Sequence, residues 1–267
     1  MPELPEVETV VRGLRPDLVG RRCGEAHASW PGVLAGESPR NFSRRIAGQE
    51  IQSLSRRGKY ICIHLERDFL VIHLRMTGRL YLSPVAEGRD AWVRLSLGLG
   101  PEHYLIFSDA RKFGRVLLVP DLVFLEEKLG PEPLDLAASD FKKLFVGSRR
   151  AVKTFLLDQK KLAGVGNIYA DEALFLAGIR PTRPVDRLRV GERVALGEAV
   201  QQVLNQAIEH EGASISWYRK PDGKEGESQK HFRVYGRREE PCYQCGTTLS
   251  KIVLGQRGTH FCPSCQS

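Results

Sequence analysis

The first residues of the chain carry the most distinctive chemistry in the sequence. They read Met1-Pro2-Glu3-Leu4-Pro5-Glu6. A methionine before a small residue is normally removed, and its removal would leave Pro2 with a secondary amine beside the carboxylate of Glu3. An α-amino group has a pKa near 8, well below that of a lysine side chain, so more of it is unprotonated at neutral pH. A secondary amine that attacks an electrophilic carbon forms an iminium cation, which promotes elimination. The start therefore predicts covalent catalysis; the alternative is an ordinary helix start, which Pro and early carboxylates also suit.

Four cysteines near the end of the chain have the spacing of a metal site. Cys242 and Cys245 form one C-x2-C pair, Cys262 and Cys265 form another, and sixteen residues separate the pairs. Two such pairs can complete a tetrahedron of thiolates around one zinc ion, with no position open for a substrate. The sequence therefore predicts one structural zinc, and a pair of disulfides is the alternative. The stretch from Gln256 to Thr259 would form the hairpin tip between the pairs.

Several shorter motifs combine basic or apolar side chains with glycine. Gly164-Val-Gly-Asn167 predicts a tight turn before a helix, whose first N–H groups can bind phosphate; a plain link between two helices is the alternative. Lys59 opens a predicted strand as an ordinary edge lysine would. His73 to Gly78 and Asp109 to Gly114 each end near a glycine turn, where Met76 and Phe113 could simply pack in the core.

Composition limits the class of protein. The 267 residues include 42% hydrophobic and 27% charged residues, and the formal net charge of +8 permits a polyanionic partner. The acidic start argues against a signal peptide, and the sequence has no run of 18 apolar residues that would predict a transmembrane helix. The cysteine pattern favours a reducing compartment, with Cys23 and Cys62 as thiols.

The elements that position these residues follow from the hydrophobic pattern. An apolar stripe from Leu4 to Leu18 predicts a first helix. Short alternating or apolar runs predict strands at 51–55, 59–65, 69–76, 92–97, 104–108 and 115–119, and such spacing is typical of an antiparallel sandwich or barrel. Helices are predicted at 150–162 and 168–177, and a third is predicted from the stripe between Leu196 and Ile208. The polar stretch 214–233 predicts a long functional or disordered loop.

These patterns predict a multidomain α+β protein. We expect a β-sandwich domain with an N-terminal helix at 1–130, a helical domain with a long loop at 131–235, and a zinc-binding segment at 236–267, to which the family resemblance described below gives the form of a zinc-finger hairpin. The boundary near 130 rests on Gly130-Pro131-Glu132-Pro133, which interrupts regular structure.

The chain resembles the formamidopyrimidine-DNA glycosylases, bifunctional enzymes that excise oxidised purines and cut apurinic sites in base excision repair. The resemblance rests on the first nine residues, the 162–170 helix-two-turn-helix motif, the strand and loop motifs above and the terminal zinc hairpin. It implies a monomeric, cytoplasmic, nucleoid-associated bacterial enzyme that binds damaged double-stranded DNA and needs no cofactor beyond zinc.

The resemblance also implies roles for individual residues. Pro2 would be the nucleophile and Glu3 the proton donor, with Lys59 and Arg257 assisting elimination. Met76, Arg111 and Phe113 would form a wedge that fills the hole left by a flipped base. The remaining implied DNA contacts are His73, Arg149, Lys153 and Asn167, the two basic residues lying one turn apart on a helix; a solvated basic face is the alternative.

Two stretches depart from the family pattern. A histidine-containing motif before the strand at 92 is replaced by Gly88-Arg89-Asp90-Ala91, and Glu227-Ser228 stands where an aromatic is usual in the loop that closes over the base. These departures keep open a sister enzyme for oxidised pyrimidines. A catalytically silent binder of damaged DNA and a zinc-ribbon RNA binder are rivals of other classes.

Overall fold

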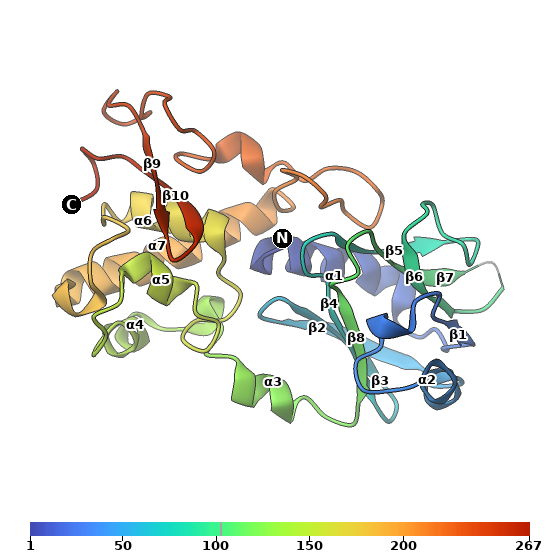
Figure 1. Cartoon of the computed structure of the whole chain (residues 1–267). Helices are drawn as coiled ribbons and strands as arrows, with labels where there is room; N and C mark the ends of the chain where they lie inside the picture. Colours follow the sequence, from blue (N-terminus) through green and yellow to red (C-terminus); the bar gives the residue numbers. More distant parts are fainter. Residues whose placement is uncertain (102) are drawn as a thin grey trace. The chain divides into compact units, whose positions relative to one another are not determined.

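The computed structural model describes residues 1–101 and 103–267, and the chain folds into two compact units (Figure 1). The first unit contains residues 1–126 together with the later segment 210–227, and the second contains residues 127–209 and 228–267. The segment 210–227 thus groups with the strand-rich unit, and the zinc hairpin groups with the helices. None of the described helices is long and apolar enough to cross a membrane.

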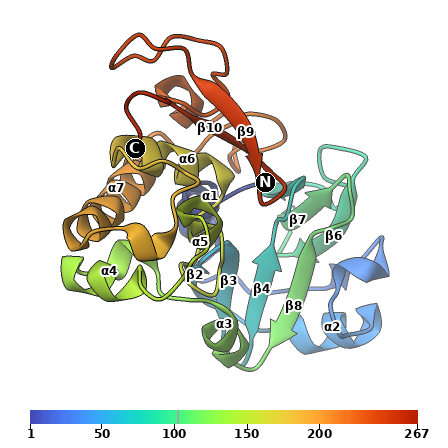
Figure 2. The same ribbon diagram turned by 60° about the vertical axis from the view of Figure 1, so that its left-hand side comes forward.

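The first unit is an antiparallel β-sandwich with a helix at its start. Its elements are α1 (Leu4–Leu18), β1 (Ala26–His27), η1 (Pro31–Val33), α2 (Pro39–Ile46), β2 (Ile51–Arg57), β3 (Tyr60–Leu65), β4 (Phe69–His73), β5 (Gly78–Ser83), β6 (Val93–Gly98), β7 (Tyr104–Asp109) and β8 (Arg115–Val119). One sheet has the strand order β1-β6-β7-β5 and the other β2-β3-β4-β8; the second is seen as a row of neighbouring strands in Figure 2. The predicted sandwich and its six predicted strands are confirmed, whereas β1, β5 and α2 were not predicted.

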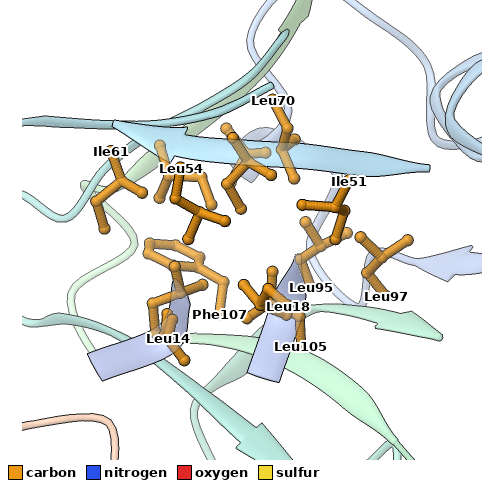
Figure 3. Close-up of a cluster of buried hydrophobic side chains, with 14 of the residues drawn as sticks. Leu14, Leu18, Ile51, Leu54, Ile61, Leu70, Leu95, Leu97, Leu105 and Phe107 are labelled. Atoms are coloured by element: carbon orange, nitrogen blue, oxygen red, sulfur yellow. The ribbon is translucent and has the colours of Figure 1, made fainter. Parts of the chain in front are cut away.

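The core of this unit lies where α1 and the two sheets meet. Leu14 and Leu18 of α1, Leu54 of β2 and Phe107 of β7 belong to one cluster of buried side chains, which point toward one another in Figure 3. The sequence of α1 favours a helix that begins where it does. Its apolar residues recur at helical spacing, and Pro5 stands in the first turn, where a missing N–H costs nothing. The packing of α1 against the two sheets therefore fixes the position of its first turn.

The second unit is helical and ends in a two-stranded hairpin. The helix α3 (Val123–Lys128) leads into it, and its elements are η2 (Pro133–Asp135), α4 (Ala138–Leu144), α5 (Val152–Leu156), α6 (Asn167–Leu176), η3 (Val185–Arg187), α7 (Val190–Glu209), η4 (Ser228–His231), β9 (Ser250–Leu254) and β10 (Arg257–Phe261). Helices α6 and α7 lie side by side (Figures 1 and 2).

The predicted helix at 150–162 is wrong in length, because α5 ends at Leu156. The Asp158 carboxylate accepts a hydrogen bond from the Lys160 N–H at 3.0 Å, and the Asp158 carbonyl accepts others from the Lys161 and Leu162 N–H groups. Asp side chains compete in this way with helical hydrogen bonds and favour turns. The segment after α5 is consequently a tight turn that leads to Gly164.

Candidate functional site

The start of α1 holds Pro2 and Glu3 in a buried position. Met1 is 46% exposed, whereas Pro2 is buried and Glu3 is only 3% exposed. Glu3 caps the helix, and its N–H donates to Oε2 of Glu6 at 2.7 Å. The other oxygen of Glu6 accepts a hydrogen bond from the Ala213 N–H at 2.8 Å. One buried carboxylate thus fixes the backbone next to Pro2 and ties it to the segment 210–227.

Lys59 and His73 lie at the same end of the second sheet. Lys59 occupies the turn between β2 and β3 and is 6% exposed. The next residue, Tyr60, pairs directly with His73 of β4, and the two rings meet edge to face at 4.5 Å. The Arg75 N–H donates to Nδ1 of His73 at 3.0 Å, so in a neutral ring the N–H is on Nε2. The pairing of β3 with β4 therefore fixes the backbone next to Lys59 and at His73.

The three predicted wedge residues meet at the surface of the first unit. Nη1 of Arg111 lies 3.1 Å from Sδ of Met76, and the guanidinium carbon of Arg111 lies 4.6 Å from the centre of the Phe113 ring. Met76 is 42% and Phe113 is 47% exposed. The alternative that these two apolar side chains pack in the core is wrong. Two exposed apolar side chains joined by an arginine can replace stacking and bond an orphaned base.

The segment 210–227 is a loop that is closed by its own hydrogen bonds. The Glu227 N–H donates to the His210 carbonyl at 2.8 Å, and the Gly226 N–H donates to the Ser214 hydroxyl at 3.0 Å. The ring of Tyr218 is part of the core of the first unit, and burial raises the pKa of its phenol. Trp217 meets Trp92 edge to face at 5.5 Å. The segment is therefore anchored on the unit that carries Pro2.

The glycine turn before α6 is confirmed as a turn. Gly164 has a φ of +83°, a region that favours glycine, and Gly166 is the residue before the first turn of α6. The side chain of Gln159 bridges the turn, since its amide nitrogen donates to the Val165 carbonyl at 2.8 Å and its oxygen accepts from the Gly164 N–H at 2.9 Å. Asn167 is thereby fixed as the first residue of α6.

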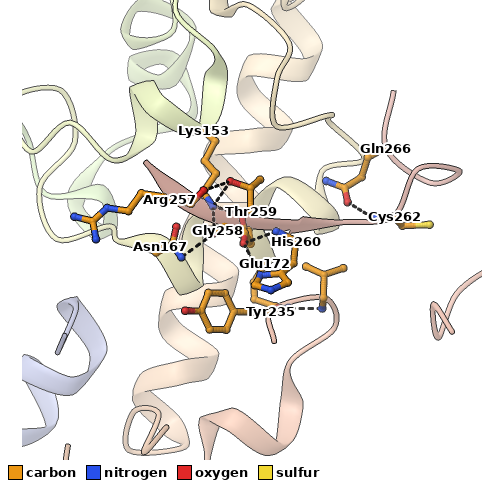
Figure 4. A network of polar contacts seen from close by, with 12 residues as sticks. Lys153, Asn167, Glu172, Tyr235, Arg257, Gly258, Thr259, His260, Cys262 and Gln266 are labelled. Atoms are coloured by element: carbon orange, nitrogen blue, oxygen red, sulfur yellow. Dashed lines mark hydrogen bonds and ion pairs between the residues drawn. The ribbon is translucent and has the colours of Figure 1, made fainter. Parts of the chain in front are cut away.

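A polar network connects this turn to the zinc hairpin (Figure 4). The Gly258 carbonyl accepts from Nδ2 of Asn167 and from Nζ of Lys153, each at 3.0 Å. Nζ of Lys153 also lies 2.8 Å from the Thr259 hydroxyl and 2.7 Å from the carboxylate of Asp171. Arg257, the first residue of β10, is exposed, and its side chain extends away from the network in Figure 4. The turn of the hairpin lies at Gly255 and Gln256, which both have positive φ, rather than across Gln256 to Thr259.

Two basic residues expected to lie one turn apart on a helix are placed differently. Arg149 is exposed but precedes α5, so it lies in a loop. Lys153 has a side chain that is 0% exposed and forms an ion pair with the equally buried Asp171. A buried ammonium needs such a partner, because desolvation of an isolated charge is costly. The structure therefore gives Lys153 a role in holding the hairpin, and the alternative of a solvated lysine is wrong for this residue. A contact between Lys153 and DNA stays a prediction.

Sequence reasoning missed the two acidic residues of α6. Asp171 accepts the His260 N–H at 2.9 Å in addition to its ion pair. Glu172 accepts N–H bonds from Arg233, Val234 and Tyr235 at 2.8 to 2.9 Å. Burial raises the pKa of Glu172, and these three N–H bonds act in the opposite direction. Two adjacent carboxylates in an otherwise apolar helix could have indicated these contacts, since acidic side chains are buried only when they have partners.

The four cysteines form a site that fits one zinc ion. Their sulfur atoms all lie within 4.8 Å of one another, with Cys242 to Cys265 at 4.0 Å and Cys245 to Cys262 at 3.5 Å. A tetrahedral zinc with Zn–S bonds of about 2.3 Å requires sulfur–sulfur distances of roughly 3.8 Å. Hydrogen bonds from the Thr247 side chain and backbone lower the pKa of Cys245 to about 6. The predicted set of four zinc ligands is confirmed, and these four thiolates leave no coordination position for a substrate.

The chain matches three family models in sequence order. They describe the formamidopyrimidine-DNA glycosylase N-terminal domain at residues 1–116, the formamidopyrimidine-DNA glycosylase H2TH domain at 129–219, and a zinc finger found in FPG and IleRS at 239–267.

Named relatives and solved structures agree with these matches. A formamidopyrimidine-DNA glycosylase of Herpetosiphon aurantiacus is 44% identical over the whole of both chains, and one of Moorella thermoacetica is 47% identical over 94% of each. A Lactococcus lactis FPG variant bound to DNA containing Fapy-dG superposes with a TM-score of 0.92 at 36% identity, covering both chains fully. The L. lactis enzyme with DNA containing an abasic site gives the same TM-score and identity over 99% of each chain.

Proposed function

Because the chain belongs to the formamidopyrimidine-DNA glycosylase family, we propose that it is a bifunctional DNA glycosylase and abasic-site lyase of base excision repair. Its substrate is double-stranded DNA with an oxidised purine, such as 8-oxoguanine or a formamidopyrimidine. The observation that carries the proposal is the buried, carboxylate-fixed Pro2-Glu3 start, in a chain that matches the family from end to end.

The proposed reaction begins once Met1 is removed. The Pro2 nitrogen bonds to C1′ of the damaged nucleotide, the glycosidic bond breaks, and the base leaves with the bonding electrons. Glu3 supplies a proton to the ring oxygen as the sugar opens, so that the adduct becomes a cationic iminium. Loss of the C2′ proton then expels the 3′ phosphate, and a second elimination expels the 5′ phosphate. We assign assistance in these eliminations to Lys59 and Arg257.

Each unit contributes residues of its own to the proposed DNA contacts. In the first unit, His73 contacts the DNA, and Met76, Arg111 and Phe113 enter the duplex where the nucleotide leaves. In the second, Asn167 and Arg149 contact the backbone, and the Arg257 guanidinium holds a phosphate at the lesion. Neutralising about six phosphates would give a log–log salt slope near −5 for binding. We propose that the enzyme acts as a monomer in the cytoplasm, at the nucleoid.

We propose the domain boundaries 1–130, 131–235 and 236–267 as sequence domains. The three matched family models fall within or close to these ranges, although the H2TH match begins two residues earlier, at 129. The compact units cut across them, because 210–227 packs with the first unit.

Borohydride trapping tests the function. The Met1-processed protein is incubated with duplexes containing an oxidised purine, an oxidised pyrimidine or no lesion, and the reduced adduct is mapped by mass spectrometry. We expect a covalent adduct on Pro2 with the purine lesion in preference to the others. Preference for the pyrimidine duplex would favour the sister enzyme, and tight binding without any adduct would favour a silent binder of damaged DNA.

A further inference from the structure

The carboxylate of Asp109 joins the two loops that carry the wedge residues. Asp109 ends β7 and is 1% exposed. Its Oδ1 accepts from the Thr77 hydroxyl and from the Arg111 N–H, the latter at 3.2 Å, and its Oδ2 accepts from the Gly114 N–H at 2.7 Å. An ionised carboxylate has only acceptor sites, so each oxygen matches the donors that face it.

The donors come from both sides of the wedge. Thr77 follows Met76 in the loop between β4 and β5, whereas Arg111 and Gly114 stand on either side of Phe113 in the loop between β7 and β8. The Thr77 hydroxyl also accepts from the Arg111 N–H at 3.2 Å. The Arg111 N–H is therefore shared between the Thr77 hydroxyl and the Asp109 carboxylate. These contacts lie at the bases of the two loops, while the side chains of Met76, Arg111 and Phe113 meet at their tips.

The main chain around Asp109 leaves little freedom for another arrangement. A Cβ atom at Gly114 would lie 2.4 Å from the Phe107 ring and 3.1 Å from Oδ2 of Asp109, so the close approach requires glycine. Arg75 and Lys112, one on each loop, have φ values of +54° and +60°. Non-glycine residues adopt this region only where surrounding contacts hold them. The Asp109 carboxylate supplies such contacts to both loops at once.

We propose that Asp109 is the positioning residue of the wedge: its carboxylate sets the spacing of the Met76 and Arg111–Phe113 loops and so sets how readily a damaged nucleotide leaves the duplex. This rests on the proposed function. Asp109 touches no reacting atom; it acts on the step before bond formation at Pro2. The consequence is selective, because a substrate whose sugar is already accessible has no need of a wedge.

The variant Asp109→Asn keeps the shape and removes one acceptor. Whichever way the amide is oriented, its NH2 group faces a donor, either the Gly114 N–H or the Thr77–Arg111 pair, and the loops lose their common anchor. We expect kcat/KM on a duplex with a formamidopyrimidine lesion to fall by about 10- to 100-fold, as misplacement of positioned groups by about 1 Å does in other enzymes. Borohydride trapping on a single-stranded oligonucleotide with an aldehydic abasic site should remain within about threefold of the wild-type rate, since base flipping is not required there.

Asp90→Asn is the matched control. Asp90 is also a carboxylate hub in this unit, accepting from the Ser108 hydroxyl at 2.6 Å, the Trp92 N–H at 2.8 Å and the Tyr81 hydroxyl at 3.3 Å, but it contacts neither wedge loop. We expect its thermal stability to fall as that of Asp109→Asn does, with duplex activity close to wild type. Thr77→Val should reproduce part of the Asp109→Asn defect. Thr77→Ser keeps the hydroxyl, so its activity on the duplex should be close to that of the wild type.

A second readout needs no bond cleavage. 2-Aminopurine beside a tetrahydrofuran abasic analogue brightens when it unstacks, so it reports entry of the wedge directly. We expect a slower or smaller rise with Asp109→Asn and a wild-type rise with Asp90→Asn. Equal losses on duplex and single-stranded substrates, or a duplex defect no larger than that of Asp90→Asn, would overturn the proposal. If the wild type forms no adduct on either substrate, the proposed function fails, and the 2-aminopurine comparison still decides the role of Asp109.

Discussion

At the scale of single residues, position at the chain start separates Pro2 from every other amine in the protein. Its nitrogen can be a nucleophile only when Met1 is absent, whereas the buried Glu3 and Glu6 keep their places through α1 and Ala213. Local sequence was enough to identify the four-cysteine zinc site, because its chemistry depends on residue type and short spacing. For Pro2 it left a nucleophile and an ordinary helix start as alternatives, and the role of Glu3 rests on the family resemblance. Burial of Lys153 could not be foreseen, because its partner Asp171 comes from another helix.

The variant Pro2→Gly tests the nucleophile. A primary amine remains after removal of Met1, so borohydride trapping should persist, but base excision should fall by about 10- to 100-fold because the ring no longer orients the nitrogen. Single-turnover kinetics on an oxidised-purine duplex measures the change. The matched control is wild-type sequence with a blocked N-terminus, which should neither trap nor cut; full activity there would refute the assignment.

The variant Lys153→Met tests whether this lysine is structural. Removing one partner of a buried ion pair typically costs about 3 to 5 kcal/mol, so urea denaturation should show a large loss in the second unit. The salt slope of DNA binding should be unchanged, whereas loss of a phosphate contact would reduce it by about 1. The double variant Lys153→Met/Asp171→Leu should recover part of the stability; a reduced slope with little loss of stability would restore the DNA-facing interpretation.

At the scale of elements, the strands could be predicted better than the segments that join them. Alternating apolar residues located all six expected strands within a few residues. The strand β5 was missed because it begins at Gly78, only four residues after β4 ends, and the predicted strand 69–76 covered most of that turn. The predicted helix at 150–162 failed at Asp158, whose side chain and carbonyl favour a turn. Register and the Asp109 hub depend on strand pairing, which a single sequence does not specify.

Glu8 provides a pH test of the contact between α1 and β2. Burial alone would raise the pKa of Glu8, but hydrogen bonds and charges from Arg12 and Arg56 outweigh it and leave the pKa below its usual 4.5. A lowered carboxyl pKa gives stability that is present above the unfolded-state pKa and is lost as pH falls through the folded-state pKa. The stability difference between wild type and Glu8→Gln should therefore be present at pH 7 and shrink below about pH 4.5.

Urea denaturation across that pH range measures the Glu8 effect. The control Glu50→Gln breaks a more exposed pair with Arg22 at 2.9 Å, and it should change stability less at pH 7. A Glu8→Gln difference that stays constant down to the acid limit would show that the charge of Glu8 contributes nothing to the contact.

At the scale of the whole molecule, each unit has its own source of stability. The first has a sandwich core with α1, and the second relies on packed helices, the Lys153–Asp171 pair and the zinc site. The formal charge of +8 is a property of the full chain and suits its polyanionic substrate.

The variant Cys245→Ser should separate these sources. Loss of a thiolate ligand should remove zinc, destabilise the hairpin and weaken DNA binding, because structural zinc contributes directly to folding. Metal analysis, DNA titration and hydrogen exchange measure the three effects. Amides of β3 and β4 should remain as protected as in the wild type. Cys23→Ser, at a buried thiol outside the cluster, controls for loss of a cysteine; unchanged affinity after metal loss would contradict a role of the hairpin in binding.

The loop 210–227 has one more consequence, for protein engineering. Its two ends are held together by the hydrogen bond from Glu227 to His210, so the chain leaves and re-enters at nearly the same point. Because its ends adjoin, we expect that the segment can be exchanged as a block with that of another glycosylase. The exchange would have to keep the buried Tyr218 ring and the Ala213–Glu6 hydrogen bond.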